Sequence, residues 1–232
     1  MFIGHHAAGF AAKRFAPRVS LGTLQIAAVF PDLLVFALLI FGIEHIRITP
    51  GITAFSWLDA QDIAISHSLA MDVIWSALLG GGYFLRRRDA RGAWVICALV
   101  LSHWVFDFLS HRPDMPLAPG VDLRLGLGLW YSLPATFVVE GALWIAGLAL
   151  YIRTTTPKTR LGTVAFCVLV GLLTMAFITM PFRSAPPSVM RAVVMAGVPL
   201  SLVLALSFGV DRLRAIRTTV RPPFAVSASI PD

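Results

Sequence analysis

The chain of 232 residues contains few charged side chains and almost no cysteine. Charged residues make up 13% of it, against roughly 25% in an ordinary soluble domain. Its two cysteines, Cys97 and Cys167, lie in apolar stretches, which excludes a disulfide framework and a cysteine-rich metal site. Hydrophobic residues make up 57% of the chain, and the mean hydropathy is +0.80. Because a soluble core cannot accommodate so much apolar surface, we expect an integral membrane protein.

Six long apolar runs are present, each bounded by charged residues or by Pro and Gly. They cover residues 20–44, 67–85, 92–110, 129–152, 161–182 and 188–211. A membrane-spanning helix needs about 20 residues, so each run predicts one transmembrane helix. The predicted fold is an all-α polytopic bundle of six long spans with an additional N-terminal membrane-associated helix, forming a single domain over residues 1–218.

Neither end of the chain is predicted to form a further long span. Residues 2–16 are apolar but lack an A-x-A-like cleavage site, so we do not expect a removable signal peptide. This stretch either lies at the membrane interface or forms a tight hairpin with the first span through residues 17–20. Residues 219–232 contain Pro and Ser without periodicity, and we expect a disordered cytoplasmic tail.

The net charge of +7 comes from basic residues at the edges of the apolar runs. They have no interleaved aromatic residues, which argues against a nucleic-acid partner and leaves the lipid bilayer as the expected one. Fourteen of the nineteen Lys and Arg residues fall on one side of the predicted topology and five on the other. The basic side is expected to be cytoplasmic and to carry the C-terminus. In a bacterium the protein would lie in the inner membrane, with loops 45–66 and 111–128 facing outward.

Ionisable side chains interrupt the apolar runs, where each is expensive and therefore a functional candidate. Those inside or at the edge of a run are Asp32, His67, His103, Asp107, His111 and Glu140. His103, Asp107 and His111 are spaced four apart, so a helix presents them on one face. With about 1.5 Å of rise per residue, Asp32, His103, Asp107 and Glu140 fall in one layer of the membrane, and His67 falls slightly above it. By contrast, His45 lies beside Glu44 and Arg47 at a span end, and we expect it to be solvated.

A hairpin at the N-terminus would also bring His5 to the level of Asp32. His5, Asp32, His67, His103 and Asp107 then form the predicted ligand set of a divalent metal ion, and we expect this ion to be zinc. Three protein ligands with an open water position suit hydrolysis. We therefore predict a membrane-embedded metal-dependent hydrolase that acts on a lipid or lipid-linked ester or phosphoester. In this hypothesis His111 or Glu140 acts as a base or orients a ligand.

Two other classes of function use the same residue types. A proton- or ion-coupled transporter also needs intramembrane acids and histidines, although the chain shows no internal repeat and its polar residues concentrate in 1–140. A structural or assembly factor could use the same groups for hydrogen bonds between helices. The oligomeric state and the substrate are not predicted.

Several short motifs carry a resemblance to a known family. They are GHHAAGFAAKR with His5, FPDLL with Asp32, SHS with His67, and LSHWVFDFLSHRPDMPL with His103, Asp107 and His111. These motifs resemble the bacterial inner-membrane metal-dependent hydrolases, which show an N-terminal His, P-D-x-D, T-H-S and S-H-x-x-x-D. The H-x-x-x-D element is also similar to the zinc-binding element of phospholipase C and related nucleases, which implies phosphodiester chemistry.

The resemblance covers residues 1–120 and departs from the family at two places. Leu34 replaces the second acid of P-D-x-D, and the basic residue and earlier histidine that usually precede T-H-S are absent before Ser66. The resemblance therefore implies a metal site at the matching residues, whereas a second metal ion lacks one of its usual ligands.

Overall fold

Helices form most of the chain. The computed structural model describes residues 1–217. Its helices are α1 (Ile3–Ala12), α2 (Leu21–Ala28), α3 (Phe30–Ile40), α4 (Ala64–His67), α5 (Leu69–Arg87), α6 (Ala90–Ser110), η1 (Leu129–Tyr131), α7 (Leu133–Thr154), α8 (Arg160–Thr179), η2 (Met180–Phe182) and α9 (Val189–Leu213). The all-α prediction is confirmed, and the tail predicted for 219–232 lies outside the described residues.

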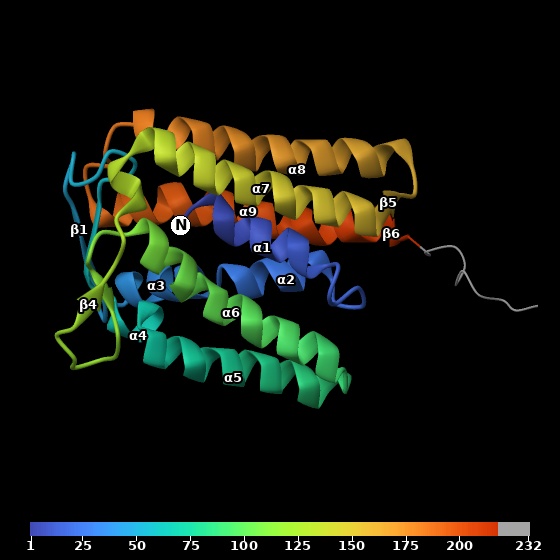
Figure 1. Cartoon of the computed structure of the whole chain (residues 1–232), viewed down its shortest axis with the longest axis horizontal. Helices are drawn as coiled ribbons and strands as arrows, with labels where there is room; N and C mark the ends of the chain where they lie inside the picture. Colours follow the sequence, from blue (N-terminus) through green and yellow to red (C-terminus); the bar gives the residue numbers. More distant parts are fainter. Residues whose placement is uncertain (218–232) are drawn as a thin grey trace, which may run out of the picture.

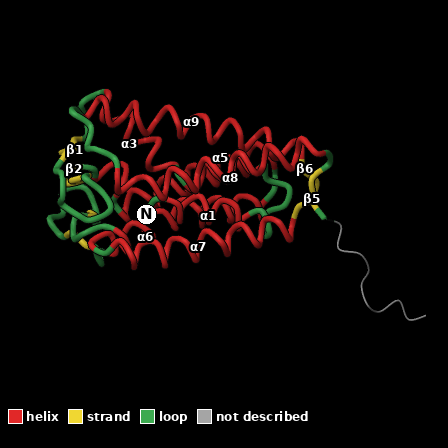
Figure 2. Tube along the Cα trace, turned by 90° about the horizontal axis from the view of Figure 1, so that it is seen from above, coloured by secondary structure: helices red, strands yellow, loops and turns green. Residues whose placement is uncertain are grey.

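Short antiparallel strand pairs lie at the two ends of the helical bundle (Figures 1 and 2). The strands are β1 (His45–Ile48) with β2 (Leu58–Asp62), β3 (Met115–Pro116) with β4 (Arg124–Leu125), and β5 (Thr155–Pro157) with β6 (Arg214–Ile216). In the first pair, His45 lies opposite Asp62 and Ile48 opposite Leu58, with an irregularity between His45 and Arg47. These pairs close the connections between helices rather than forming a sheet layer.

Within the described chain, four helices are long and apolar enough to cross a membrane, judged by length and composition: α6, α7, α8 extended through η2, and α9. A fifth span results if α2 and α3 count as one, although they are bent by 61° at the break. The protein is thus an integral membrane protein by this criterion, but the prediction of six spans is wrong. The run at 67–85 forms most of α5. The 19 residues of this helix include Asp72, Arg86 and Arg87 and are too polar for a candidate span.

The N-terminal helix α1 lies inside the bundle, where it packs against α2, α6 and α7 (Figure 1). His5 and His6 are both buried on it. The chain turns back after α1, and α2 begins with Ser20 as N-cap, whose side chain accepts a hydrogen bond from the Thr23 N–H. The hairpin arrangement is therefore the one adopted. It matters for the site because it carries a histidine into the centre of the bundle.

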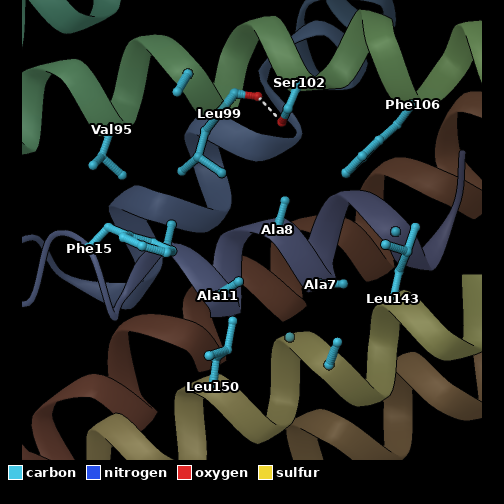
Figure 3. Close-up of a pocket in the computed structure, with 15 residues that line it drawn as sticks. Ala7, Ala8, Ala11, Phe15, Val95, Leu99, Ser102, Phe106, Leu143 and Leu150 are labelled. Carbon is cyan, nitrogen blue, oxygen red and sulfur yellow. Dashed lines mark hydrogen bonds between the residues drawn. The ribbon is translucent and has the colours of Figure 1, made fainter.

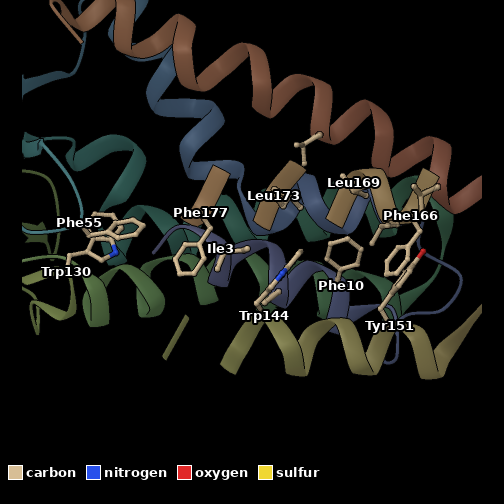
Figure 4. Close-up of a cluster of buried hydrophobic side chains, with 14 residues drawn as sticks. Ile3, Phe10, Phe55, Trp130, Trp144, Tyr151, Phe166, Leu169, Leu173 and Phe177 are labelled. Atoms are coloured by element: carbon tan, nitrogen blue, oxygen red, sulfur yellow. The ribbon is translucent and has the colours of Figure 1, made fainter. Parts of the chain in front are cut away.

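Aromatic side chains hold α1 against α7 and α8 (Figure 4). The buried ring of Phe10 makes edge contacts with Trp144 at 5.5 Å, Tyr151 at 5.1 Å and Phe166 at 6.1 Å between centroids. Edge-to-face packing of this kind adds roughly 0.5–1.5 kcal/mol per pair beyond the buried area. On the opposite side of α1, the Gln25 carboxamide contacts the His6 ring at 2.8 Å and donates to the His6 carbonyl at 3.1 Å. These contacts fix the position of α1.

Gly147 on α7 allows α1 to approach closely, and we expect Gly147→Ala to destabilise the protein. A Cβ atom there would lie 2.4 Å from the carbonyl oxygen of Ala7, so one backbone must move. Forcing such overpacking costs about 1–3 kcal/mol. The matched control is Gly141→Ala on the same helix, where a Cβ meets no atom within 4 Å. Thermal unfolding in detergent should show a lower midpoint for Gly147→Ala alone. Equal midpoints for the two variants would contradict the close packing of α1 on α7.

The two ends of the bundle differ in charge. The turns after α1, between α5 and α6 and between α7 and α8 meet the end of α9 at one end of the bundle, marked by β5 and β6 in Figure 1. Most Lys and Arg residues of the described chain lie in these turns, on the adjoining helix ends or at the end of α9. The loops 45–66 and 111–128 lie together at the opposite end, as the topology prediction requires (Figure 1). We call the first the basic end and the second the loop end.

Candidate metal centre

Five side chains from four helices converge near the loop end of the bundle. They are His5 from α1, Asp32 from α3, His67 from α4, and His103 and Asp107 from α6, and we call them the polar cluster. One potential ligand atom from each of His5, His103 and Asp107 lies within 4.8 Å of the others, and the same holds for Asp32, His67 and His103. The structure therefore brings together all five predicted metal ligands. The two groups share His103.

Local structure explains how each element delivers its side chain. On α6, His103 and Asp107 are four residues apart and share one face. The break between α2 and α3 changes the chain direction at Val29, and Pro31 and Asp32 form the first turn of α3. Pro lacks an N–H and is tolerated in that position. The one-turn helix α4 then ends at His67.

The imidazole nitrogens of the polar cluster face carboxylate oxygens. His5 Nε2 lies 3.0 Å from Asp107 Oδ1, and His103 Nε2 lies 3.2 Å from Asp107 Oδ2. His67 Nε2 is 3.6 Å from Asp32 Oδ1 and 3.9 Å from Asp107 Oδ2. The His5 and His103 rings stack with centroids 3.8 Å apart. Every member of the polar cluster except Asp32 is buried, and the Asp32 side chain is 36% exposed, so the cluster opens at this residue.

A hydrogen bond on the far side of the His103 ring determines which of its nitrogens faces the cluster. His103 Nδ1 lies 2.9 Å from the carbonyl oxygen of Ala28, which can only accept, so Nδ1 carries the proton. In a neutral ring, Nε2 then presents a lone pair to the Asp107 carboxylate. His103 Nε2 and His5 Nδ1 are buried and lack a hydrogen-bond partner among the described residues. A proton or a metal cation is needed between acceptors that face one another in this way, and the set of nitrogen and oxygen ligands fits a divalent metal ion.

Glu44 and Ser66 support His67 and were not predicted as site residues. Ser66 Oγ lies 2.7 Å from His67 Nδ1 and donates to Glu44 Oε2 at 2.6 Å, while Glu44 Oε1 accepts from the N–H groups of Ile65 and Ser66. Glu44 is 2% exposed, whereas its neighbour His45 is solvated as expected. Because Ser66 donates its proton to Glu44, its oxygen accepts the His67 Nδ1 proton and leaves Nε2 free to face the cluster. This arrangement is typical of the outer partners of a metal ligand.

We expect Ser66→Ala to weaken metal binding by about 10- to 100-fold, because without this hydrogen bond the His67 ring is no longer held in the orientation that faces the cluster. Glu44→Gln should have a similar but smaller effect through Ser66. The control is Ser102→Ala, since within residues 1–217 the Ser102 hydroxyl bonds only to the carbonyl of Leu99 on its own helix. Competition between the purified protein and a chelator measures the affinity. If Ser66→Ala and Ser102→Ala have the same metal affinity, the role of Ser66 in orienting His67 is contradicted.

His111 lies beside the cluster toward the loop end. Its Nε2 is 4.0 Å from Asp107 Oδ1, and its Nδ1 is 3.2 Å from Asp114 Oδ1. Arg112 forms ion pairs with Asp59 and, through Nε at 3.1 Å, with Asp114. A carboxylate fixed by arginine therefore orients the His111 ring. The α-amino group of Met1 also forms an ion pair with Asp107.

Glu140 lies near the cluster, but both of its oxygens are engaged elsewhere. Oε2 accepts hydrogen bonds from the N–H groups of Phe2, Ile3 and Gly4 at 2.9, 2.8 and 3.3 Å, and Oε1 accepts from Trp130 Nε1 at 3.0 Å. A carboxylate from α7 thus caps the N-terminus of α1, where the helix dipole favours negative charge. This geometry supports a positioning role through His5 rather than the role of base.

An apolar groove borders the cluster between α1, α6 and α7 (Figure 3). It has a volume of about 510 Å³. Small residues of α1 line it, Ala7, Ala8 and Ala11 among them, while Leu99 and Phe106 come from α6 (Figure 3). The ring of Phe106 lies 6.0 Å from the ring of His5. The groove therefore runs along α1 from the neighbourhood of the cluster toward the basic end.

Comparison of the chain with protein-family models, with curated proteins and with solved structures finds no match. The resemblance to membrane hydrolases accordingly depends on the short motifs alone.

Proposed function

We propose that this protein is a membrane-embedded metal-dependent hydrolase that acts on a lipid or lipid-linked ester or phosphoester. The observation that carries the proposal is the convergence of three imidazoles and two carboxylates around buried nitrogens that lack a hydrogen-bond partner among the described residues. His5, Asp32, His67, His103 and Asp107 would hold the ion, with zinc as the preferred metal for nitrogen and oxygen ligands. A bound divalent ion supplies Lewis acidity and activates water near neutral pH.

The residues around the ligands have separate tasks in this proposal. Ala28 and Ser66 hold the rings of His103 and His67 in the required tautomers. His111, oriented by Asp114, is placed to accept a proton at Nε2 from a reacting group beside Asp107. Glu140 holds α1, and with it His5, in place. The positioning groups keep the donors fixed before a substrate enters, which lowers the reorganisation needed during reaction.

The groove supports a lipid as the substrate. Its lining is formed almost entirely by apolar side chains, it reaches Phe106 beside His5, and two candidate spans form its walls. From Gly4 to Phe15 it follows α1 and the turn after it, so a helical rise of about 1.5 Å per residue gives a length of roughly 16 Å. One leaflet contributes about half of a hydrocarbon core of about 30 Å. A single acyl chain therefore matches the groove in length and polarity.

The basic end is proposed to face the cytoplasm of a bacterial cell, with the protein in the inner membrane and its C-terminus inside. The excess of Lys and Arg in the turns at that end supports this orientation. The polar cluster then lies toward the outer face.

Ala8→Phe should impair hydrolysis of long-chain substrates selectively. The larger side chain fills the groove, so KM should rise roughly 10-fold or more for long-chain lipid esters or phosphodiesters, with little change for short-chain analogues. The assay uses metal-loaded protein in detergent and chromogenic substrates of graded chain length, with His103→Ala as the inactive control. Equal changes for both chain lengths would argue against the groove as the acyl site. Undiminished hydrolysis by His103→Ala would argue against the proposed function itself.

A coupled transporter is a second candidate, favoured by one observation. The break between α2 and α3 places the partly exposed carboxylate of Asp32 at a discontinuous helix, an arrangement found in ion-coupled transporters. Proteoliposomes would distinguish the two, because a transporter gives ion-driven flux without stoichiometric metal.

A further inference from the structure

Three arginines at the basic end surround a hollow that lies apart from the polar cluster. Arg18 comes from the turn before α2, and Arg87 and Arg88 come from the end of α5. They line a hollow of about 440 Å³, which we call the arginine hollow. Within residues 1–217, none of the three guanidinium groups forms a hydrogen bond or an ion pair, although Arg88 lies over the ring of Phe84 at 5.9 Å.

Hydroxyl groups complete the lining. Ser20 and Thr23 lie at the N-terminus of α2, and their oxygens are 2.7 Å apart. The N-terminal end of a helix adds partial positive charge. Asp89 is the acid in the lining, and its carboxylate accepts from the Gly92 N–H at 3.1 Å and lies 3.5 Å from the Tyr83 hydroxyl. With three arginines against one occupied carboxylate, the hollow is suited to an anion with several oxygen acceptors.

Exposed residues near the hollow are of the kinds found at a membrane interface. Trp94, in the second turn of α6, is 75% exposed, and tryptophan at the lipid-facing surface is typical of the headgroup region. Leu85, beside the arginines on α5, is 68% exposed and offers an apolar surface to lipid chains. The excess of positive charge at this end explains the number of arginines. It does not explain why three of them, without ion-pair partners in the described chain, meet at one hollow beside hydroxyl groups.

We infer that the arginine hollow binds the phosphate of an anionic phospholipid from the leaflet at the basic end. The guanidinium groups and hydroxyls hold the phosphate oxygens, while the acyl chains lie along the apolar surface of α5. Basic hollows between helices at the membrane surface are suited to such headgroups. This binding is independent of the proposed hydrolase activity, because the hollow and the polar cluster share no residue.

The test compares two triple variants that remove equal charge from the same end. Arg18→Gln/Arg87→Gln/Arg88→Gln empties the hollow of arginine, whereas Arg14→Gln/Arg91→Gln/Arg160→Gln changes exposed arginines outside it. Each protein is reconstituted in nanodiscs of mixed phosphatidylglycerol and phosphatidylcholine, and retained lipid is counted by native mass spectrometry. We expect the hollow variant to lose roughly 10-fold or more of its preference for phosphatidylglycerol and the control to keep most of it.

Three results would overturn the inference. Equal losses in the two triple variants would show that charge at this end acts diffusely. No preference of the wild type for phosphatidylglycerol would show that no anionic lipid is held. Displacement of the lipid by millimolar inorganic phosphate would show that the hollow binds a soluble anion rather than a lipid. Thermal unfolding of both variants checks that each is folded.

Discussion

Replacing His103 with Ala is expected to lower the affinity for zinc more than 100-fold. His103 belongs to both groups of potential ligands, its Nε2 lies 3.2 Å from Asp107, and its Nδ1 is held by Ala28. Loss of an outer partner of a metal ligand already costs 10- to 100-fold, so loss of a shared ligand should cost more. Competition with a chelator of known affinity measures the change in purified protein.

The matched control for this variant is His45→Ala. His45 is a histidine of the same chain that lies on β1, pairs with Asp62 and has a side chain that is 67% exposed. Its replacement should leave the zinc affinity within about twofold of the wild type, since exposed ion pairs contribute little. If both substitutions reduce the affinity equally, zinc binds nonspecifically to histidine and the polar cluster is not its site.

Glu140→Ala is expected to produce the largest loss of stability, about 3–5 kcal/mol in the free energy of unfolding. The fully buried carboxylate accepts three N–H groups at the start of α1 and the indole N–H of Trp130. Removing it leaves these donors buried and unpaired, and each costs roughly 1–3 kcal/mol before relaxation. Zinc affinity should fall as well, because His5 follows the capped turn directly. Denaturant titration and chelator competition measure the two effects.

Glu140→Gln provides the internal comparison, because it keeps the size of the side chain and one acceptor oxygen. It should recover part of the lost stability, as a neutral acceptor is weaker than a carboxylate. Gly141→Ala, on the adjacent and open position of α7, should change neither quantity. A Glu140→Ala variant with the stability and zinc affinity of Gly141→Ala would contradict the capping role.

The members of the polar cluster could be predicted because acids and histidines stand out in apolar runs. His103 and Asp107 needed only helical spacing, and Asp32 needed only its place in an apolar run. His5 could be predicted as a member because a hairpin at Arg18 places it at the same membrane depth as Asp32. The supporting residues could not be found in this way: the burial of Glu44 depends on a loop folding back over α4, which no periodicity records.

The number of transmembrane spans was the part of the fold that was predicted wrongly from the sequence. Hydropathy alone does not show that the first run is bent at Val29, or that the charged ends of α5 shorten its apolar stretch. The role of Glu140 was also not readable from its position in an apolar run, because it depends on where α1 begins in space. Side-chain type therefore predicted which residues form the polar cluster, whereas their supporting contacts required the three-dimensional arrangement.

The metal content of the purified protein tests the central claim most directly. Wild-type protein, equilibrated with zinc and freed of excess, should hold about one ion per chain, and His103→Ala/Asp107→Ala should hold almost none. Elemental analysis of both proteins, normalised to protein concentration, gives the ratio. Less than about 0.3 zinc per chain in the wild type, unchanged in the double variant, would contradict a metal centre at the polar cluster.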